Sequence, residues 1–157
     1  MEPSYPLQLR ASSRLQLEYR DGILCIIGIP IARQVSERMS VAELKREFAP
    51  VSGTTLRVVN QNGVEQTDTE AAVTGTVVRL ENSEGTVIGR ATVLITGDVL
   101  GSGLINIAQL VRLAQDLNKD RVLLGVFELA GDITRTGEIN IVDLVKEAQL
   151  LHPELDS

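Results

Sequence analysis

The sequence predicts an α+β protein in which a β-rich N-terminal part precedes a small, wholly helical C-terminal part. Up to residue 96 most apolar residues recur with a period of two, which is typical of strands, and after Gly97 the period is that of an amphipathic helix. A polar, glycine-containing loop also occurs twice in the C-terminal part, each time before a helical segment. We place the boundary at Gly97, which gives domains 1–96 and 97–157 with no flexible linker between them.

Composition limits the kinds of partner that we expect. The chain has 157 residues, of which 43% are hydrophobic and only 3% aromatic, so its core must be aliphatic. A net charge of −6 argues against nucleic acid and anionic membranes as partners. We find neither a membrane-spanning apolar run nor a signal peptide, so an extracellular role requires that this chain be part of a larger secreted protein.

The N-terminal part has the predicted order strand, strand, helix, strand, strand, strand. Strands are expected over 14–21, 23–29, 54–60, 76–81 and 86–96. A capping box from Ser40 to Glu43 starts the helix, and Pro50 ends it. This order favours a β-grasp-like module, with an immunoglobulin-like sandwich carrying one helix as the alternative.

Nothing in the sequence indicates an enzyme. Cys25 lies in an apolar run and is expected to be a buried, inert thiol, and the absence of a second cysteine excludes an intramolecular disulfide. No nucleophile is placed with a base. We therefore expect a structural or interaction protein.

The C-terminal part contains an internal duplication, with repeats at 97–118 and 131–152. Each residue of the second copy lies 34 positions after its counterpart, as Gly131 does after Gly97. Both copies have the outline of an EF-hand-type calcium loop, with Asp at position 1 and Gly at position 6, and a helix follows each loop. Residues 121–130 are expected to form a connecting helix or helical turns.

The first loop has lost much of its calcium-ligand set. Side-chain ligands are needed at positions 1, 3, 5, 9 and 12, and a backbone carbonyl at position 7. Asp98, Ser102, Leu104 and Asn106 stand at ligand positions, but Leu100 has no ligating atom and Gln109 replaces a carboxylate. We expect no useful calcium affinity in this loop.

The second loop keeps an oxygen at every ligand position. Its candidate ligands are Asp132, Thr134, Thr136, the Glu138 carbonyl, Asn140 and Asp143. Since only two of these are carboxylates, a dissociation constant of roughly 10⁻⁴–10⁻³ M or weaker is expected. Alternatively, both loops are only turns, in which Asp98 and Asp132 form Asx hydrogen bonds while Asn106 and Asn140 cap helices. We favour this alternative for the first loop, and both interpretations stay open for the second.

Tandem loops that begin Gly-Asp, with Gly at position 6 and Ile-Asn at positions 8 and 9, resemble a type I dockerin with two F-hand repeats. The preceding β-rich part, with its Ser40-Val-Ala-Glu-Leu-Lys segment, is similar to the X modules that precede some dockerins. The resemblance implies a non-catalytic, monomeric docking module that binds a cohesin-type domain. It also implies an extracellular or cell-surface bacterial assembly, such as a cellulosome that degrades polysaccharides. The departures at Leu100, Gln109, Thr134 and Thr136 argue against the calcium-dependent folding that is normal in that family.

A second apolar stripe on the helices is the candidate partner surface. The family's recognition positions correspond to Ile107, Ala108, Ile141 and Val142. From spacing alone, each repeat places an apolar trio on one helix face, namely Ile107, Val111 and Ala114 in the first and Ile141, Val145 and Ala148 in the second. Arg112, Gln115, Lys146 and Gln149 would form a polar rim. The alternative is a structural module without an external partner, whose stripe packs the helices on each other or on the β-rich part.

Overall fold

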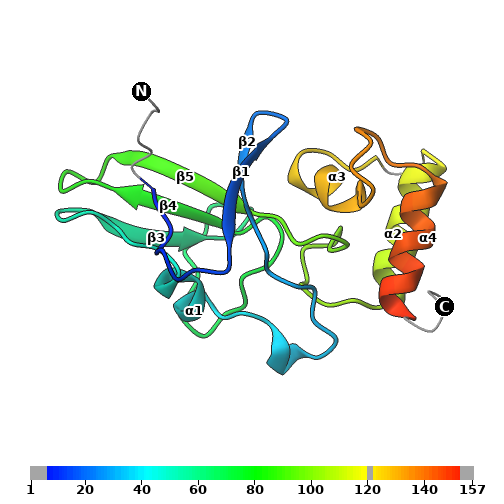
Figure 1. Ribbon diagram of the computed structural model, residues 1–157, viewed down its shortest axis with the longest axis horizontal. Coiled ribbons are helices and arrows are strands. Elements are labelled where there is room, and N and C mark those ends of the chain that lie inside the picture. The colour runs from blue at the N-terminus through cyan, green and yellow to red at the C-terminus, as the bar shows by residue number, and fades with distance from the viewer. Residues whose placement is uncertain (1–6, 120–121, 153–157) are drawn as a thin grey trace.

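The computed structural model describes residues 7–119 and 122–152 and shows an α+β chain (Figure 1). A sheet with one helix on it occupies one end of the molecule, helices α2 and α4 lie side by side at the other end, and helix α3 lies between these two parts. The α+β class predicted from the sequence is confirmed.

The sheet is mixed and has the strand order β1-β2-β5-β4-β3. Its strands are β1 (Gln16–Arg20), β2 (Ile23–Ile27), β3 (Thr55–Val59), β4 (Val77–Glu81) and β5 (Val87–Val93). All neighbouring strands are antiparallel except β2 and β5, which are parallel. Within the described residues there is one sheet and not two facing sheets, so the immunoglobulin-like alternative is wrong.

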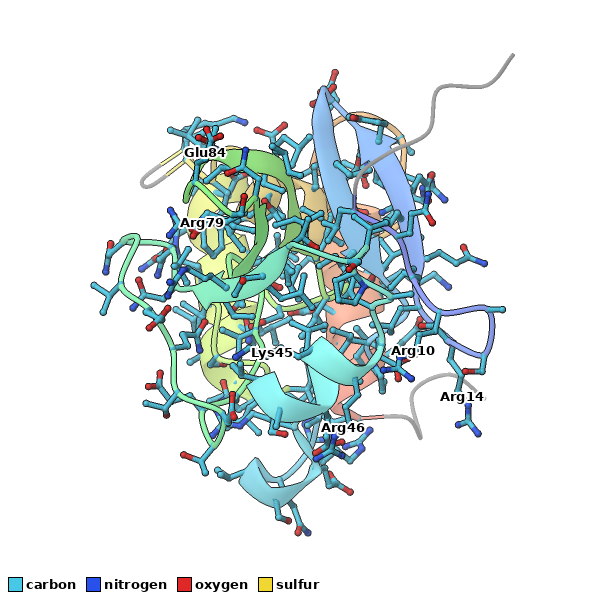
Figure 2. All side chains as sticks on the ribbon, turned by 90° about the vertical axis from the view of Figure 1, so that its left-hand side faces the viewer. Arg10, Arg14, Lys45, Arg46, Arg79 and Glu84 are labelled. Atoms are coloured by element: carbon cyan, nitrogen blue, oxygen red, sulfur yellow. The ribbon has the colours of Figure 1, made fainter. Side chains whose placement is uncertain are left out.

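A short helix covers one face of this sheet. Helix α1 (Val41–Arg46) follows a single 3₁₀ turn, η1 (Val35–Glu37), and begins after Ser40, whose hydroxyl oxygen accepts the Glu43 amide proton at 3.2 Å as the capping box predicts. The Glu43 carboxylate accepts a hydrogen bond from the Ser40 hydroxyl at 3.2 Å. A regular capping box predicts instead that this carboxylate accepts from the Ser40 amide. Val41, Leu44 and Phe48 are fully buried against the strands and form the centre of the main core. Basic side chains, including Lys45 and Arg46, surround α1 at the end of the molecule that faces away from α2 and α4 (Figure 2).

The C-terminal part contains three helices, α2 (Ile107–Leu117), α3 (Val126–Gly131) and α4 (Ile141–Leu151). Helix α3 is shorter than the predicted 121–130, because it begins only after Gly125, whose φ of 60° lies outside the helical region. Residue 121 lies outside the described residues. Val99, Leu113, Leu123 and Ala130 form the buried centre of this part. None of the helices described here is long and apolar enough to cross a membrane.

The two parts are joined by direct hydrogen bonds. The Ala32 amide donates to the Gly103 carbonyl at 2.9 Å, and the Ile105 amide donates to the Ala32 carbonyl at 2.8 Å. The Arg33 guanidinium donates to the Leu150 carbonyl, at the end of α4, at 2.8 Å. The first loop and α4 are therefore anchored on the β-rich part, which agrees with the expectation that the two parts are close neighbours.

Candidate docking surface and loops

The first loop is organised around the Asp98 carboxylate, which is fully buried. Its Oδ1 accepts the Ser102 amide proton at 2.9 Å, and its Oδ2 accepts the Gly103 amide proton at 2.9 Å. A third amide, from Thr74 in the β-rich part, donates to Oδ2 at 3.1 Å. The Asx bonding predicted for this loop is confirmed, whereas the contact from Thr74 was not predicted.

The residues at the ligand positions of the first loop are not arranged to bind a calcium ion. The amide nitrogen of Gln109, at loop position 12, donates to Asp98 Oδ1 at 2.8 Å and to the Leu104 carbonyl at 2.9 Å. It also donates to Ser102 Oγ at 3.1 Å, so three of the oxygens that would bind the ion are already bonded to this N–H₂ group. Leu100 contributes only its backbone amide, which donates to Gln109 Oε1 at 2.9 Å.

The second loop repeats the amide hydrogen bonds to its first aspartate, but its other ligand oxygens are bonded through hydroxyl groups. Asp132 accepts from the Thr136 amide at 3.0 Å and from the Gly137 amide at 2.8 Å. The Thr136 hydroxyl donates to the Glu138 carbonyl at 2.9 Å, and the Thr134 hydroxyl donates to Asp143 at 2.8 Å. Because hydroxyl protons can rotate away, this set remains compatible with a weakly held cation.

Both helices that follow the loops are capped as the sequence predicts. The Asn106 side-chain oxygen accepts from the Ala108 amide at 3.0 Å, and that of Asn140 accepts from the Val142 amide at 2.9 Å. Asp143 adds a reciprocal bond, in which its carboxylate accepts from the Asn140 amide at 2.8 Å. Each cap fixes the start of its helix relative to its loop, and so sets the direction of α2 and α4.

An open groove of about 450 Å³ runs between α2 and α4 and is lined only by apolar side chains, three from each helix. The lining residues are Leu110, Val111, Ala114, Leu144, Val145 and Ala148. The three of α4 are the counterparts, 34 positions later, of the three of α2. Helical spacing predicts that Leu110 and Leu144 belong to an apolar stripe that packs in the core, but both are half-buried and reach the groove.

The other predicted partner residues surround this groove or extend it. Ile107 and Ile141, at the starts of the two helices, are 62% and 63% exposed, and Val111 and Val145 are 51% and 49% exposed. Ala108 and Val142 are also exposed. Lys146 is exposed, while Arg112, Gln115 and Gln149 are half-buried. The apolar stripe is thus not covered by the β-rich part.

Sequence reasoning missed one polar residue of the helix pair, Glu147. Its side chain is fully buried, and neither carboxyl oxygen has a hydrogen-bond partner among the described residues. Burial raises its pKa to about 8, and the nearby Asp98 charge adds to the shift. The repeat offers a signal that could have found it, because Glu147 occupies the position that Leu113 fills in the first copy.

Comparisons with known proteins give no family assignment. No protein-family model, curated protein or solved structure matches this chain. Among residues 7–119 and 122–152, no three His, Cys, Asp or Glu side chains are grouped closely enough to hold a metal ion. A cation in the second loop would therefore have to rely on hydroxyl and carbonyl oxygens in addition to Asp132 and Asp143.

Proposed function

We propose that this chain is a non-catalytic docking module, of the dockerin kind preceded by an X-module-like domain, that attaches a larger secreted protein to a cohesin-type domain. The observation that carries the proposal is the groove between α2 and α4, which presents the same three apolar positions from each repeat. The extracellular bacterial setting follows from the sequence resemblance and is part of the proposal.

The exposure of the groove supports a partner. Apolar side chains that a fold leaves uncovered in a contiguous patch are characteristic of interaction surfaces. Here four large aliphatic side chains are each about half exposed or more, and they are the ones that the duplication places at equivalent positions, Ile107, Val111, Ile141 and Val145. Two separate helices would not retain the same exposed apolar positions if these served only to pack the domain.

The positive charges beside the groove indicate which charges the contact face of a partner would carry. Arg112 and Lys146 occupy equivalent positions in the two helices, next to Val111 and Val145. A partner that fits this surface has an apolar patch flanked by acidic residues, because opposite charges at the rim favour association. We therefore propose a cohesin-type domain whose contact face is apolar with acidic borders.

Calcium has a limited place in this proposal. We propose that any calcium binding is confined to the second loop and is weak, because Asp132 and Asp143 are the only carboxylates at its side-chain ligand positions. If the ion binds, it would be held by these carboxylates and by the oxygens of Thr134, Thr136, Glu138 and Asn140. It would then hold the start of α4 and supply no chemistry.

A second candidate function is a structural terminal module without an external partner. The observation that favours it is the set of hydrogen bonds that anchors the first loop and the end of α4 on the β-rich part. These contacts lie away from the residues that line the groove. They are compatible with docking, so a binding measurement decides between the two functions.

The test is a calorimetric titration of the purified chain against a panel of cohesin domains. We expect at least one cohesin to bind, and we expect a Val111→Asp/Val145→Asp double variant to weaken that binding by at least about 10-fold, because two carboxylates would be desolvated in the interface. Both valines are replaced because α2 and α4 present equivalent apolar residues, so a partner that loses its contact with one helix can still bind the other.

The matched control is Val64→Asp, since Val64 is 59% exposed on a loop of the β-rich part. This variant should bind with unchanged affinity. Absence of binding to every cohesin tested would contradict the cohesin assignment. Equal binding by the double variant and the control would contradict the groove as the contact surface.

A further inference from the structure

The side chain of Gln109 lies where an EF-hand-type loop would hold its ion. It is fully buried, and its amide nitrogen lies 2.8 Å from Asp98 Oδ1, 3.1 Å from Ser102 Oγ and 2.9 Å from the Leu104 carbonyl oxygen. These three oxygens belong to loop positions 1, 5 and 7, all of which face the cation when one is bound. A single N–H₂ group thus contacts three of the oxygens that calcium would otherwise bring together.

The orientation of this amide is fixed by its other end. Gln109 Oε1 accepts the Leu100 amide proton at 2.9 Å, so the oxygen faces a donor and the nitrogen faces acceptors. The opposite orientation would place the oxygen against a carboxylate and a carbonyl, which cannot donate. Leu100 therefore takes part through its backbone, although its side chain has no ligating atom.

Both oxygens of the buried Asp98 carboxylate are hydrogen-bonded without an ion. It accepts four hydrogen bonds, from the amides of Ser102, Gly103 and Thr74 and from the Gln109 side chain. Hydrogen bonds from several amides can stabilise a buried charge in place of a counter-ion. Thr74 belongs to the β-rich part, so one of the four donors is available only when both parts of the chain are together.

The second loop does not have this arrangement. Asp143 stands at the equivalent position, but its shorter side chain is turned toward the Thr134 and Asn140 amides, at 2.9 and 2.8 Å. A carboxylate also has no proton to donate. The centre of the second loop therefore receives no comparable N–H₂ group from its twelfth position.

We propose that the Gln109 carboxamide is a built-in substitute for the calcium ion, so that the first loop closes and α2 is held in place without metal. The inference does not depend on which partner the groove binds, because its readouts are stability and the state of the Gln109 amide. It concerns only the first loop, and the second loop serves as an internal comparison.

The first test uses the unmodified protein. In two-dimensional ¹⁵N NMR we expect the Gln109 side-chain amide protons to be protected from exchange with solvent in EDTA. We also expect them to be unmoved by millimolar calcium chloride, while any calcium-induced shifts are confined to the second loop. Rapid exchange in EDTA, or calcium-induced shifts of Gln109 and the first-loop amides, would overturn the proposal.

The second test compares two variants that make the same chemical change on α2. Gln109→Glu replaces the donating amide by a second buried carboxylate beside Asp98, whereas Gln115→Glu changes a half-buried glutamine outside the loop. In EDTA we expect Gln109→Glu to melt at least about 5 °C below Gln115→Glu. Recovery of Gln109→Glu by calcium would support the proposal further, and equal melting temperatures in EDTA would overturn it.

Discussion

At the scale of single residues, Glu147 is the most unusual feature of the molecule. An ideal Cβ added to Gly97 would lie 2.7 Å from Glu147 Oε2, so the carboxyl group packs directly on the backbone of that glycine. Gly97 also has a φ of 88°, which favours glycine. The carboxyl is fully buried, and its desolvation, together with the nearby Asp98 charge, raises its pKa.

The raised pKa makes stability depend on pH in a defined direction. In the unfolded chain Glu147 ionises near its ordinary pKa of 4.5, whereas in the folded protein it ionises only near 8. Below pH 4.5 it is protonated in both states, and its burial then has no ionisation cost. Between these two values the unfolded state alone loses the proton, so stability falls as the pH rises, by up to about 1.4 kcal/mol per pH unit.

We predict that Glu147→Leu removes most of this dependence. The variant should raise the melting temperature, and the gain should increase from pH 5 to pH 8, because leucine already fills the equivalent position at Leu113. The measurement is a series of thermal melts from pH 5 to pH 9. The control is Glu84→Leu, at the exposed turn between β4 and β5 (Figure 2). A gain that does not change with pH would show that Glu147 is charged in the folded protein.

Much of this residue-scale structure could be predicted from the sequence. The Asx bonds of Asp98 and Asp132 and the caps at Asn106 and Asn140 were predicted because they depend on neighbours within a few residues. The role of Gln109 as a hydrogen-bond donor was not predicted. A comparison with the calcium-ligand set shows only whether a residue can bind an ion, and not whether its side chain can take the place of one. Glu147 was overlooked because a charged residue on an amphipathic helix is normally assigned to the solvent face.

At the scale of elements, the strands agree with the sequence better than the connections do. All five strands lie within the predicted segments, because period-two patterns and turn residues are local signals. Strand β5 ends at Val93 instead of 96, and the Ile95 amide donates to the Thr74 hydroxyl at 3.0 Å and not to a neighbouring strand. The sequence also could not show that Leu110 and Leu144 reach an open groove. A helical stripe predicts which residues share a face but not what covers that face.

The second loop offers an element-scale test of calcium binding. We predict that Asp132→Ala abolishes any rise in melting temperature produced by millimolar calcium chloride, because it removes one of the two carboxylates at the side-chain ligand positions of that loop. Asp98→Ala should lower the melting temperature in EDTA but leave the calcium-induced rise unchanged. Thermal melts of both variants with and without calcium measure this. Equal loss of the calcium effect in the two variants would contradict the confinement of calcium to the second loop.

At the scale of the whole molecule, the two parts share a continuous interface. Phe127 of α3 packs on the β-rich part, where an ideal Cβ at Gly75 would lie 2.9 Å from its ring. A small core formed by Cys25, Leu94 and Val126 also joins the sheet to α3, and Ile23 and Ile27 pack against it. These contacts link residues that are far apart in the chain, so no periodicity or spacing in the sequence could have predicted them.

This interface predicts that the C-terminal part does not fold well alone. A fragment of residues 97–157 would lack Thr74, which donates to the buried Asp98 carboxylate, and would expose Val126 and Phe127 to water. The loss of one hydrogen bond to a buried carboxylate and the loss of apolar burial each cost about 1–3 kcal/mol, which is a large share of the stability of so small a unit.

Circular dichroism of this fragment and of the full chain provides the measurement. We expect the full chain to melt in one cooperative transition and the fragment to have a low helical signal without a sharp transition, in EDTA and in calcium alike. Phe127→Ala in the full chain should lower the temperature of the single melting transition without splitting it into two, because one interface stabilises both parts. A fragment that melts cooperatively with its full helical content would show that the helix pair folds independently, and that the contacts with the sheet only orient the groove.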